Sequence, residues 1–313
     1  MMARQSVWGW PAWANFFLGG AGASLYIMGR IAAADTAAVR GLDVLALLLV
    51  LCGLVAVYIE AGKRMRAIYA FRGAWTRMGH RSWMSREAIA ATVFILAGAM
   101  DLVADNTVFD IVALTAAAVY LVSQSLIPSS ARLIPAWSNN AMPVLMLVTS
   151  LMAGTGLALI ISPIAPQLAA TVNTLTFSLV KTGTAAGTVV LPTGLESGEL
   201  VRVIAAASIL VAVFYAYFPG STVHFRHALR HDGNYLFYAL FVLLGGVAPL
   251  LMSSDVFGGV LLVLGSAGLK YVVLIRMSYK LDPISYLAEL LSPPRGSHQI
   301  PQEPLDREGE QPP

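Results

Sequence analysis

Long apolar runs separated by short polar segments dominate the chain. A helix that crosses a bilayer needs about 20 mainly apolar residues, and eight stretches reach or approach that length: residues 10–33, 43–62, 86–104, 108–127, 141–162, 199–218, 235–252 and 256–279. This pattern predicts an all-α integral membrane protein with one transmembrane domain over residues 1–280. The remaining residues, 281–313, form a Pro-rich polar tail that we expect to be cytoplasmic and partly disordered.

One further stretch has the length of a crossing but a polar composition. Residues 168–191 include Asn173, Lys181 and several threonines. A crossing here would be the ninth. The alternative is that residues 163–198 form an outer loop with an interfacial or re-entrant helix, which backbone hydrogen bonding permits where protein covers the segment.

The distribution of Lys and Arg decides between these alternatives. Residues 60–87 carry seven of the twenty Lys and Arg residues, and basic loops of this kind stay in the cytoplasm during insertion. With eight crossings and both termini cytoplasmic, fifteen of the twenty lie in inner segments and four in outer segments. A ninth crossing would move four basic residues of the last third to the outside. We therefore predict an eight-transmembrane-helix bundle.

Composition excludes several classes of protein and of site. Hydrophobic residues make up 57% of the 313 residues and charged residues 12%, about half the charged fraction of a soluble domain. The net charge of +3 lies in loops beside the membrane, so it does not indicate nucleic-acid binding. The single cysteine, Cys52, excludes an intrachain disulfide and a cluster held by four cysteines of this chain.

Histidine gives no sign of a haem or metal site. None of the five histidines lies inside a predicted crossing, so no haem held by paired intramembrane histidines is expected. His224, His227 and His231 have a helical spacing that metal ligands can adopt. The arginines between them make a basic cytoplasmic loop the favoured interpretation.

Candidate chemistry lies in polar residues near the predicted cytoplasmic ends of the crossings. Asn15 is one turn into the first, Glu60 ends the second, and Tyr120 and Gln124 share a face of the fourth because they are four residues apart. An amide, an acid and a phenol at similar depth could hydrogen-bond a quinone carbonyl and exchange its protons, and polar residues in a bilayer are candidates for function. The alternative is hydrogen bonding between helices, with Tyr120 as an interfacial anchor.

Three more ionisable residues stand out. Asp101 and Asp105 are one turn apart at the outer end of the third crossing, where they form either a proton exit or a solvated helix end. Lys270 lies deep in the last crossing, and we expect it to pair with a carboxylate rather than to face lipid. Together these residues are candidates for a proton path.

Several motifs resemble one family of membrane anchors. WGWPAWANFFLGGAGASLYIMG (residues 8–29) resembles the first helix of the NrfD / polysulfide reductase membrane subunits. EAGKRMRAI followed by HRSWMSREAI resembles that family's acidic–Gly–basic pattern and its S-W-[IM]-S-R-E block, and GLKYVVLI (268–275) resembles its last-helix signature. RLIPAWSN (132–139) looks like a loop of anchors of the phenylacetyl-CoA:acceptor oxidoreductase type, and the matches extend over almost the whole chain.

The resemblance implies a multi-pass anchor of a molybdopterin oxidoreductase in a bacterial or archaeal cytoplasmic (inner) membrane. Such anchors, of the DMSO-reductase type, exchange electrons between quinone and a ferredoxin-like iron–sulfur subunit, which serves a molybdopterin catalytic subunit. They hold no haem or iron–sulfur cluster of their own. Family members place quinone between a first-helix Asn and His and a fourth-helix Tyr. Asn15 and Tyr120 match, whereas Gly19 stands where the His is expected, and Glu60 is our substitute.

The basic loop is the candidate surface for docking of the iron–sulfur partner on the cytoplasmic face. Its aromatic residues suit a protein interface, although such loops also bind lipid headgroups. The docking candidates are Lys63, Arg64, Arg66, Arg72, Arg77 and Arg81. Two other functions stay open: a secondary transporter, against which the lack of an internal repeat weighs, and a purely structural anchor without a quinone site.

Overall fold

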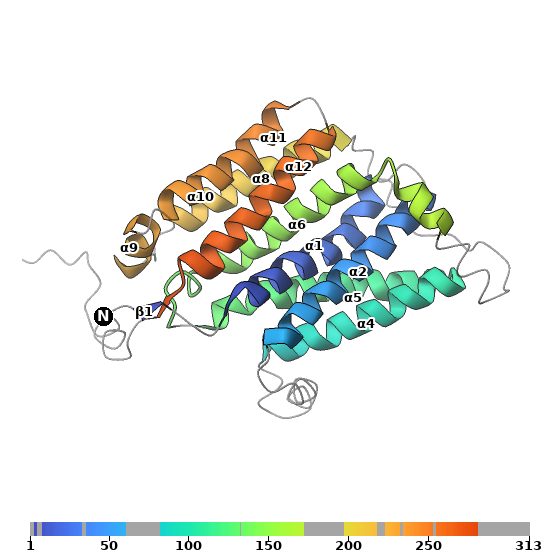
Figure 1. Cartoon of the computed structure of the whole chain (residues 1–313), viewed down its shortest axis with the longest axis horizontal. Coiled ribbons are helices and arrows are strands. Elements are labelled where there is room, and N and C mark those ends of the chain that lie inside the picture. Colours follow the sequence, from blue (N-terminus) through green and yellow to red (C-terminus); the bar gives the residue numbers. More distant parts are fainter. Residues whose placement is uncertain are drawn as a thin grey trace, which may run out of the picture.

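The described part of the chain is a bundle of long helices that lie side by side (Figure 1). The computed structural model describes residues 3–4, 8–32, 36–60, 82–131, 133–171, 197–217, 223–231, 234–252 and 255–280. Its first helices are α1 (Trp10–Ala32), α2 (Thr36–Glu60), α4 (Trp83–Ala104), α5 (Thr107–Leu126) and α6 (Met142–Ile161). Then follow α8 (Ser197–Tyr217), α9 (Val223–His231), α10 (Asn234–Val242), the π-helical turn η4 (Leu243–Val247), α11 (Ala248–Leu251), α12 (Asp255–Tyr271) and the π-helical turn η5 (Val272–Arg276).

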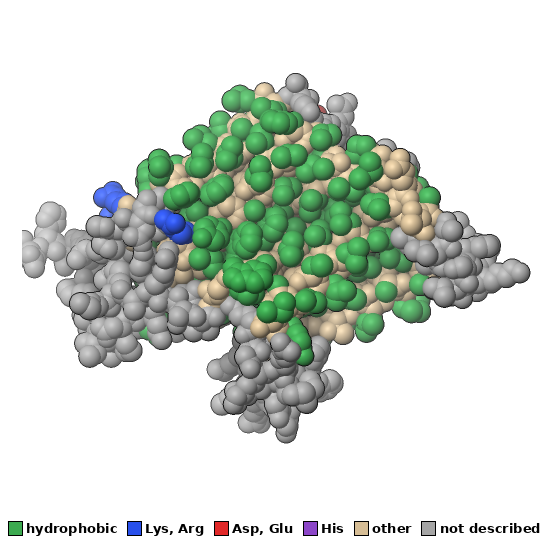
Figure 2. Space-filling view, viewed as in Figure 1, with side chains coloured by type: hydrophobic (Ala, Val, Ile, Leu, Met, Phe, Trp, Pro, Cys, Tyr) green, Lys and Arg blue, Asp and Glu red, His purple; other side chains and the backbone are tan. Residues whose placement is uncertain are grey.

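Six of these segments are long and apolar enough to cross a membrane: Ala37–Ile59, Trp83–Ala104, Thr107–Ser130, Met142–Ile161, Gly198–Tyr217 and Val256–Arg276. The all-α class and the multi-pass membrane assignment are therefore confirmed. The other two predicted crossings are also helical, as α1 and as the shorter apolar stretch Tyr235–Leu251. Large apolar side chains such as Leu96, Leu210 and Leu236 are exposed, and Figure 2 shows hydrophobic side chains over most of one face of the bundle, as expected of a surface in contact with lipid.

The predicted and observed helix boundaries differ most at α2. The helix begins at Thr36, seven residues before the predicted crossing. Arg40 lies in this first part, and Asp43 is the first residue of the predicted crossing. Arg40 forms an ion pair with Asp105, and Asp43 forms one with Arg30. Because both charges have partners from other helices, the helix continues through them.

The two ends of the described chain meet at one end of the bundle. A short antiparallel pairing joins β1 (Ala3–Arg4) to β2 (Tyr279–Lys280), with Ala3 opposite Lys280. A chain with an even number of crossings has both ends on the same side of the membrane, so this pairing agrees with an even number. The side of the membrane on which this end lies stays a prediction, as does the count of eight.

Helices α6 and α8 run antiparallel. The Asn139 side chain, just before α6, donates a hydrogen bond to the Tyr215 carbonyl near the end of α8, and Leu159 near the end of α6 packs with Leu200 near the start of α8. The segment between these helices therefore leaves and returns at the same end of the bundle, as the eight-crossing prediction requires. Residues 172–196, which hold most of the predicted re-entrant segment, lie outside the described residues, as do the tail 281–313 and residues 61–81.

Helix α1 lies inside the bundle and contacts α2, α5, α6 and α12. Small residues make these contacts close, as the glycine-rich first crossing predicts. A Cβ at Gly22 would lie 2.6 Å from the Ala46 carbonyl oxygen of α2, and a Cβ at Gly154 of α6 would collide with Ser24 of α1. The polar side chains of α1 therefore lie within reach of several neighbouring helices.

Candidate functional site

Four buried polar side chains from three helices meet near one end of the bundle. We call this group the Glu87 cluster: Asn15 of α1, Glu87 of α4, and Tyr120 and Gln124 of α5. Gln124 Nε2 lies 3.2 Å from Glu87 Oε1 and 2.9 Å from the Tyr120 hydroxyl, and Asn15 Nδ2 donates to Glu87 Oε1 at 3.4 Å. All four residues are at least 92% buried. The sequence analysis predicted three of the four members.

Local sequence explains how the cluster forms. Tyr120 and Gln124 are one turn apart on α5 and so share a face, while Glu87 lies near the start of α4 and points into the bundle. Gly19 of α1 is the residue that allows the close fit. A Cβ there would collide with the Tyr120 hydroxyl and would lie 3.1 Å from Gln124 Nε2. Any larger side chain at position 19 would need the space that the Tyr120 hydroxyl occupies in this structure.

The hydrogen bonds of the Glu87 cluster are not fully matched. Gln124 Nε2 also lies 3.2 Å from the Asn15 carbonyl oxygen, so it faces three acceptors with only two hydrogens. Asn15 Oδ1 is buried and has no hydrogen-bond partner. A buried polar atom without a partner costs free energy, so this site has an acceptor to offer to a ligand or to water.

Lys270 of α12 lies beside this cluster. Its ammonium donates to the Phe16 carbonyl oxygen at 2.7 Å and to Ser150 Oγ at 2.8 Å. A Cβ at Gly20 would lie 2.9 Å from Gln124 Oε1 and 2.8 Å from Lys270 Nζ, so both side chains reach the same surface of α1. Lys270 is buried, as predicted. Its hydrogen-bond partners among the described residues are a carbonyl and a hydroxyl, and the predicted carboxylate partner is not found among them.

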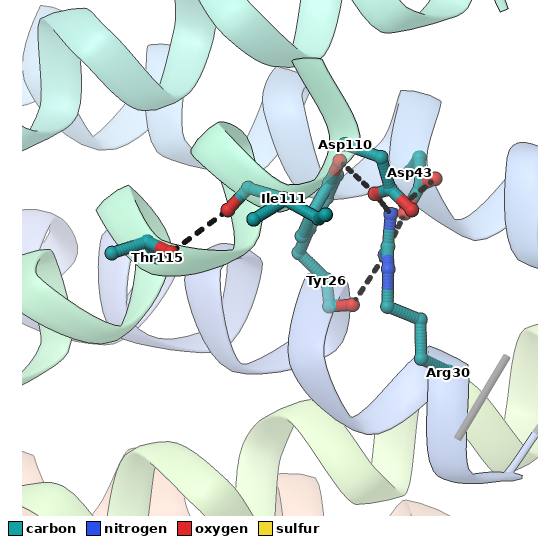
Figure 3. Close-up of polar contacts among 6 residues, drawn as sticks. All are labelled: Tyr26, Arg30, Asp43, Asp110, Ile111 and Thr115. Atoms are coloured by element: carbon teal, nitrogen blue, oxygen red, sulfur yellow. Dashed lines mark hydrogen bonds and ion pairs between the residues drawn. The ribbon is translucent and has the colours of Figure 1, made fainter. Parts of the chain in front are cut away.

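A second buried group, the Arg30 cluster, lies near the opposite end of α1 (Figure 3). It consists of Tyr26 and Arg30 of α1, Asp43 of α2 and Asp110 of α5. Arg30 Nη1 donates to Asp43 Oδ1 at 2.7 Å and to the Tyr26 carbonyl at 2.6 Å, and Nη2 pairs with Asp110. The Tyr26 hydroxyl donates to Asp110 at 3.0 Å, and the guanidinium lies 3.7 Å from the centre of the Tyr26 ring. The cluster thus ties three helices together through one cation.

Asp101 and Asp105 lie at the end of the bundle that holds the Arg30 cluster. Lys270 lies at the other end, beside the Glu87 cluster. Asp101 is buried and lies within electrostatic range of Asp110 and Arg30. Asp105 is the left-handed C-cap of α4 (φ 47°), and its partly exposed carboxylate pairs with Arg40 at 3.3 Å. The three residues predicted as a proton path therefore belong to two separate places in the bundle.

The side chains of the remaining predicted site residues lie outside the described part of the chain. Glu60 is the last residue of α2, and its side chain lies outside the described residues, as do the six docking candidates between 63 and 81. Glu87 is the residue that the sequence analysis missed. Its signal was present in the S-W-M-S-R-E block, but the block gave no indication of which of its side chains points inward.

Among the described residues, no group of three or more His, Cys, Asp or Glu side chains is arranged to hold a metal ion. The backbone of His224, His227 and His231 belongs to α9, but their side chains lie outside the described part.

Comparison with known proteins identifies the family to which this chain belongs. A search of curated proteins finds no match to this chain. The sequence profile of the DMSO reductase anchor subunit (DmsC) matches residues 23–275, a range that includes Glu87, Tyr120, Gln124, Lys270 and the whole Arg30 cluster. Since the match covers well over half of the sequence and the fold is a multi-pass helical bundle, the chain belongs to the DMSO reductase anchor subunit family.

Proposed function

We propose that this chain binds a quinone or quinol at the Glu87 cluster and exchanges electrons with a ferredoxin-like iron–sulfur subunit, which serves a molybdopterin catalytic subunit. As a member of its family, the chain is the membrane anchor of a molybdoenzyme complex. Quinone binding and the individual partners are the parts that we add. Membership of this family favours an anchor over a transporter.

The observation that carries the proposal is a buried carboxylate held only by neutral groups. Glu87 is 8% exposed, and its hydrogen-bond partners are neutral groups: the side-chain amides of Asn15 and Gln124 and the Tyr120 hydroxyl. No Lys or Arg of the described part forms an ion pair with it. An acid in a bilayer without a paired cation is costly for stability and is therefore a candidate for function.

The donor set fits a quinone headgroup. A quinone carbonyl needs a hydrogen-bond donor, which the Tyr120 hydroxyl would supply; the two hydrogens of the Gln124 amide already face acceptors of the protein. A quinol hydroxyl needs an acceptor, which the unpartnered Asn15 Oδ1 supplies. Bound quinone would contribute two-electron, two-proton redox chemistry. In that reaction Glu87 would take up or deliver a proton.

The location of the Glu87 cluster supports docking of the partner on the cytoplasmic side. Helix α2 ends at Glu60 and α4 begins at Trp83, so the basic segment between them leaves the bundle at the end where Glu87 lies. Positive charge keeps such a segment in the cytoplasm. Eight crossings, cytoplasmic termini and docking on Lys63, Arg64, Arg66, Arg72, Arg77 and Arg81 complete the proposal.

The motif RLIPAWSN supports a finer placement among NrfD-type anchors close to the phenylacetyl-CoA:acceptor oxidoreductase branch. In this structure the Trp137 indole of that motif donates to the Val273 carbonyl at 3.0 Å, and the Ala136 carbonyl accepts from Tyr215. The motif thus has a packing role at the end of the bundle where the Glu87 cluster lies.

The test is electron transfer between a quinol analogue and the iron–sulfur partner in the intact complex. Glu87→Gln and Tyr120→Phe should lower the rate by about 100-fold or more, since a positioned acid or base contributes about that factor. Ser125→Ala is the matched control, because its hydroxyl donates only to the Leu121 carbonyl of its own helix, and its rate should stay within twofold of wild type.

Two further variants separate the alternatives. Glu60→Gln tests the acid that the sequence analysis chose: a loss there with none in Glu87→Gln would move the site to the end of α2. Binding of a quinone analogue, measured by fluorescence quenching, gives a second readout. Wild-type rates and binding in Glu87→Gln, Tyr120→Phe and Glu60→Gln would remove the assignment of the quinone site to these residues, and absence of analogue binding to the wild-type chain would leave it as a purely structural anchor.

A further inference from the structure

An apolar groove runs along the outer side of the seam between α4 and α5. It has a volume of about 450 Å³, and almost all of its exposed lining is apolar. Its walls are the exposed side chains of Ile89 and Val93 on α4 and of Ile111, Val112 and Val119 on α5. Its floor consists of two small residues, Ala90 and Ala116, both buried. The groove therefore exists because alanines occupy the seam while branched side chains stand on either side.

The groove is more apolar than its residue types suggest. Thr115 is its one uncharged polar residue, and the Thr115 hydroxyl donates to the Ile111 carbonyl of its own helix at 2.8 Å (Figure 3). This leaves its methyl group to contact an occupant. Along α5 the lining extends over residues 111–119, about 12 Å at 1.5 Å per residue, which is close to the roughly 15 Å thickness of one leaflet.

Among the described residues that line the groove, one is a cation, and it lies at one end. Arg86 lies in the first turn of α4, is exposed, and its guanidinium lies 4.2 Å from the centre of the Trp83 ring. The N-cap residue Ser82 makes no side-chain hydrogen bond to the first turn. An anion here would meet the guanidinium and the N–H groups at the positive end of a helix dipole. Trp and Arg side chains also mark the level of lipid headgroups.

We propose that this groove is a binding site for one anionic phospholipid, whose acyl chain lies along the α4–α5 seam and whose phosphate pairs with Arg86. The charge at one end, the apolar trough of one-leaflet length and the position of Trp83 together fit this ligand. A neutral isoprenoid tail would gain nothing from Arg86. The site faces lipid and is separate from the Glu87 cluster, which lies inside the same seam.

The experiment is native mass spectrometry of the purified complex, supplied with phosphatidylglycerol or phosphatidylcholine of the same acyl composition. Wild-type protein should retain one phosphatidylglycerol more strongly than phosphatidylcholine. Arg86→Gln should lower phosphatidylglycerol retention about fivefold, the factor expected for one arginine near the membrane surface, and should leave phosphatidylcholine unchanged. Arg226→Gln, an exposed arginine of α9, is the control for charge.

Substitutions in the floor of the groove provide a second, independent test of the proposal. Ala116→Leu fills the groove and should lower retention of both lipids, whereas Ala118→Leu, at an exposed alanine of the same helix that does not line the groove, should change neither. A phosphatidylglycerol carrying a photoreactive acyl chain should label peptides that contain residues 86–93 and 111–119. Equal retention in Arg86→Gln and Arg226→Gln would overturn the proposal. So would a retained quinone that is lost in Ala116→Leu but indifferent to Arg86→Gln.

Discussion

The two buried polar clusters of this protein both include residues of α1, but they balance their buried charges in different ways. The Arg30 cluster brings two carboxylates to one guanidinium, with ion pairs from α1 to both α2 and α5. The Glu87 cluster places two amides around one carboxylate, and the buried Lys270 beside it bonds to a carbonyl and a hydroxyl instead.

This difference indicates which cluster holds the fold together and which is available for chemistry. Charges buried in a membrane protein are tolerated when paired, and the Arg30 guanidinium pairs with both Asp43 and Asp110. A carboxylate held by weak neutral donors can change its proton content without breaking an ion pair. The contrast predicts that substitutions at the two ends of α1 will separate stability from activity.

The largest effect is expected from Arg30→Met. Removing the guanidinium leaves Asp43 and Asp110 buried without their cation, and breaking a buried ion pair in this way costs about 3–5 kcal/mol. The free energy of unfolding in mild detergent should fall by that amount, whereas Arg226→Gln should have almost no effect. The triple variant Arg30→Met, Asp43→Asn, Asp110→Asn should recover much of the loss. An unfolding midpoint for Arg30→Met equal to that of wild type would remove the structural role of this cluster.

A smaller effect is expected from Gly20→Ala. The added Cβ would lie 2.5 Å from Ser150 Oγ and 2.8 Å from Lys270 Nζ, and overpacking of this kind costs about 1–3 kcal/mol. Binding of a quinone analogue should weaken together with stability, because Gln124 contacts the same surface. Gly258→Ala is the matched control, since its Cβ would meet only Val201, at 3.6 Å. Equal melting temperatures for the two variants would contradict the close packing at Gly20.

Lys270→Met should separate stability from activity most clearly. The swap keeps the volume, so the free energy of unfolding should change by less than about 1.5 kcal/mol, in contrast to Arg30→Met. Electron transfer to the quinone analogue should fall about tenfold, since a cation beside Gln124 would interact with the charge that develops on the headgroup by a kcal/mol or more. A large loss of stability here would show that Lys270 acts as a structural cation like Arg30.

The smallest effect is expected from Arg40→Gln. The Arg40 and Asp105 side chains are 19% and 22% exposed and lie 3.3 Å apart, and such ion pairs near the surface contribute about 0–1 kcal/mol. The loss in the free energy of unfolding should shrink further at high salt. A loss as large as that of Arg30→Met, unaffected by salt, would place this pair within the buried network.

Much of the fold followed from sequence alone. The positions of the helices came from apolar length, and most of the predicted crossings begin or end within a few residues of the observed helices. Depth along the helix axis was also predictable, which is why Asn15, Tyr120 and Gln124 were found. The direction in which Glu87 points was not predictable. In a block as short as S-W-M-S-R-E, the sequence does not show which side chain faces the interior of the bundle.

By itself, the sequence determined that this is a membrane protein of many helices, and its motifs indicated the anchor family. Those properties depend on composition and on the one-dimensional order of apolar and charged residues, because the bilayer acts on each crossing separately. Tertiary structure alone decided which polar residues meet. The rotation of each helix about its axis, set by contacts such as Gly19 with Tyr120 and Gly154 with Ser24, turns Glu87 toward Gln124 and Arg30 toward two aspartates from distant parts of the chain.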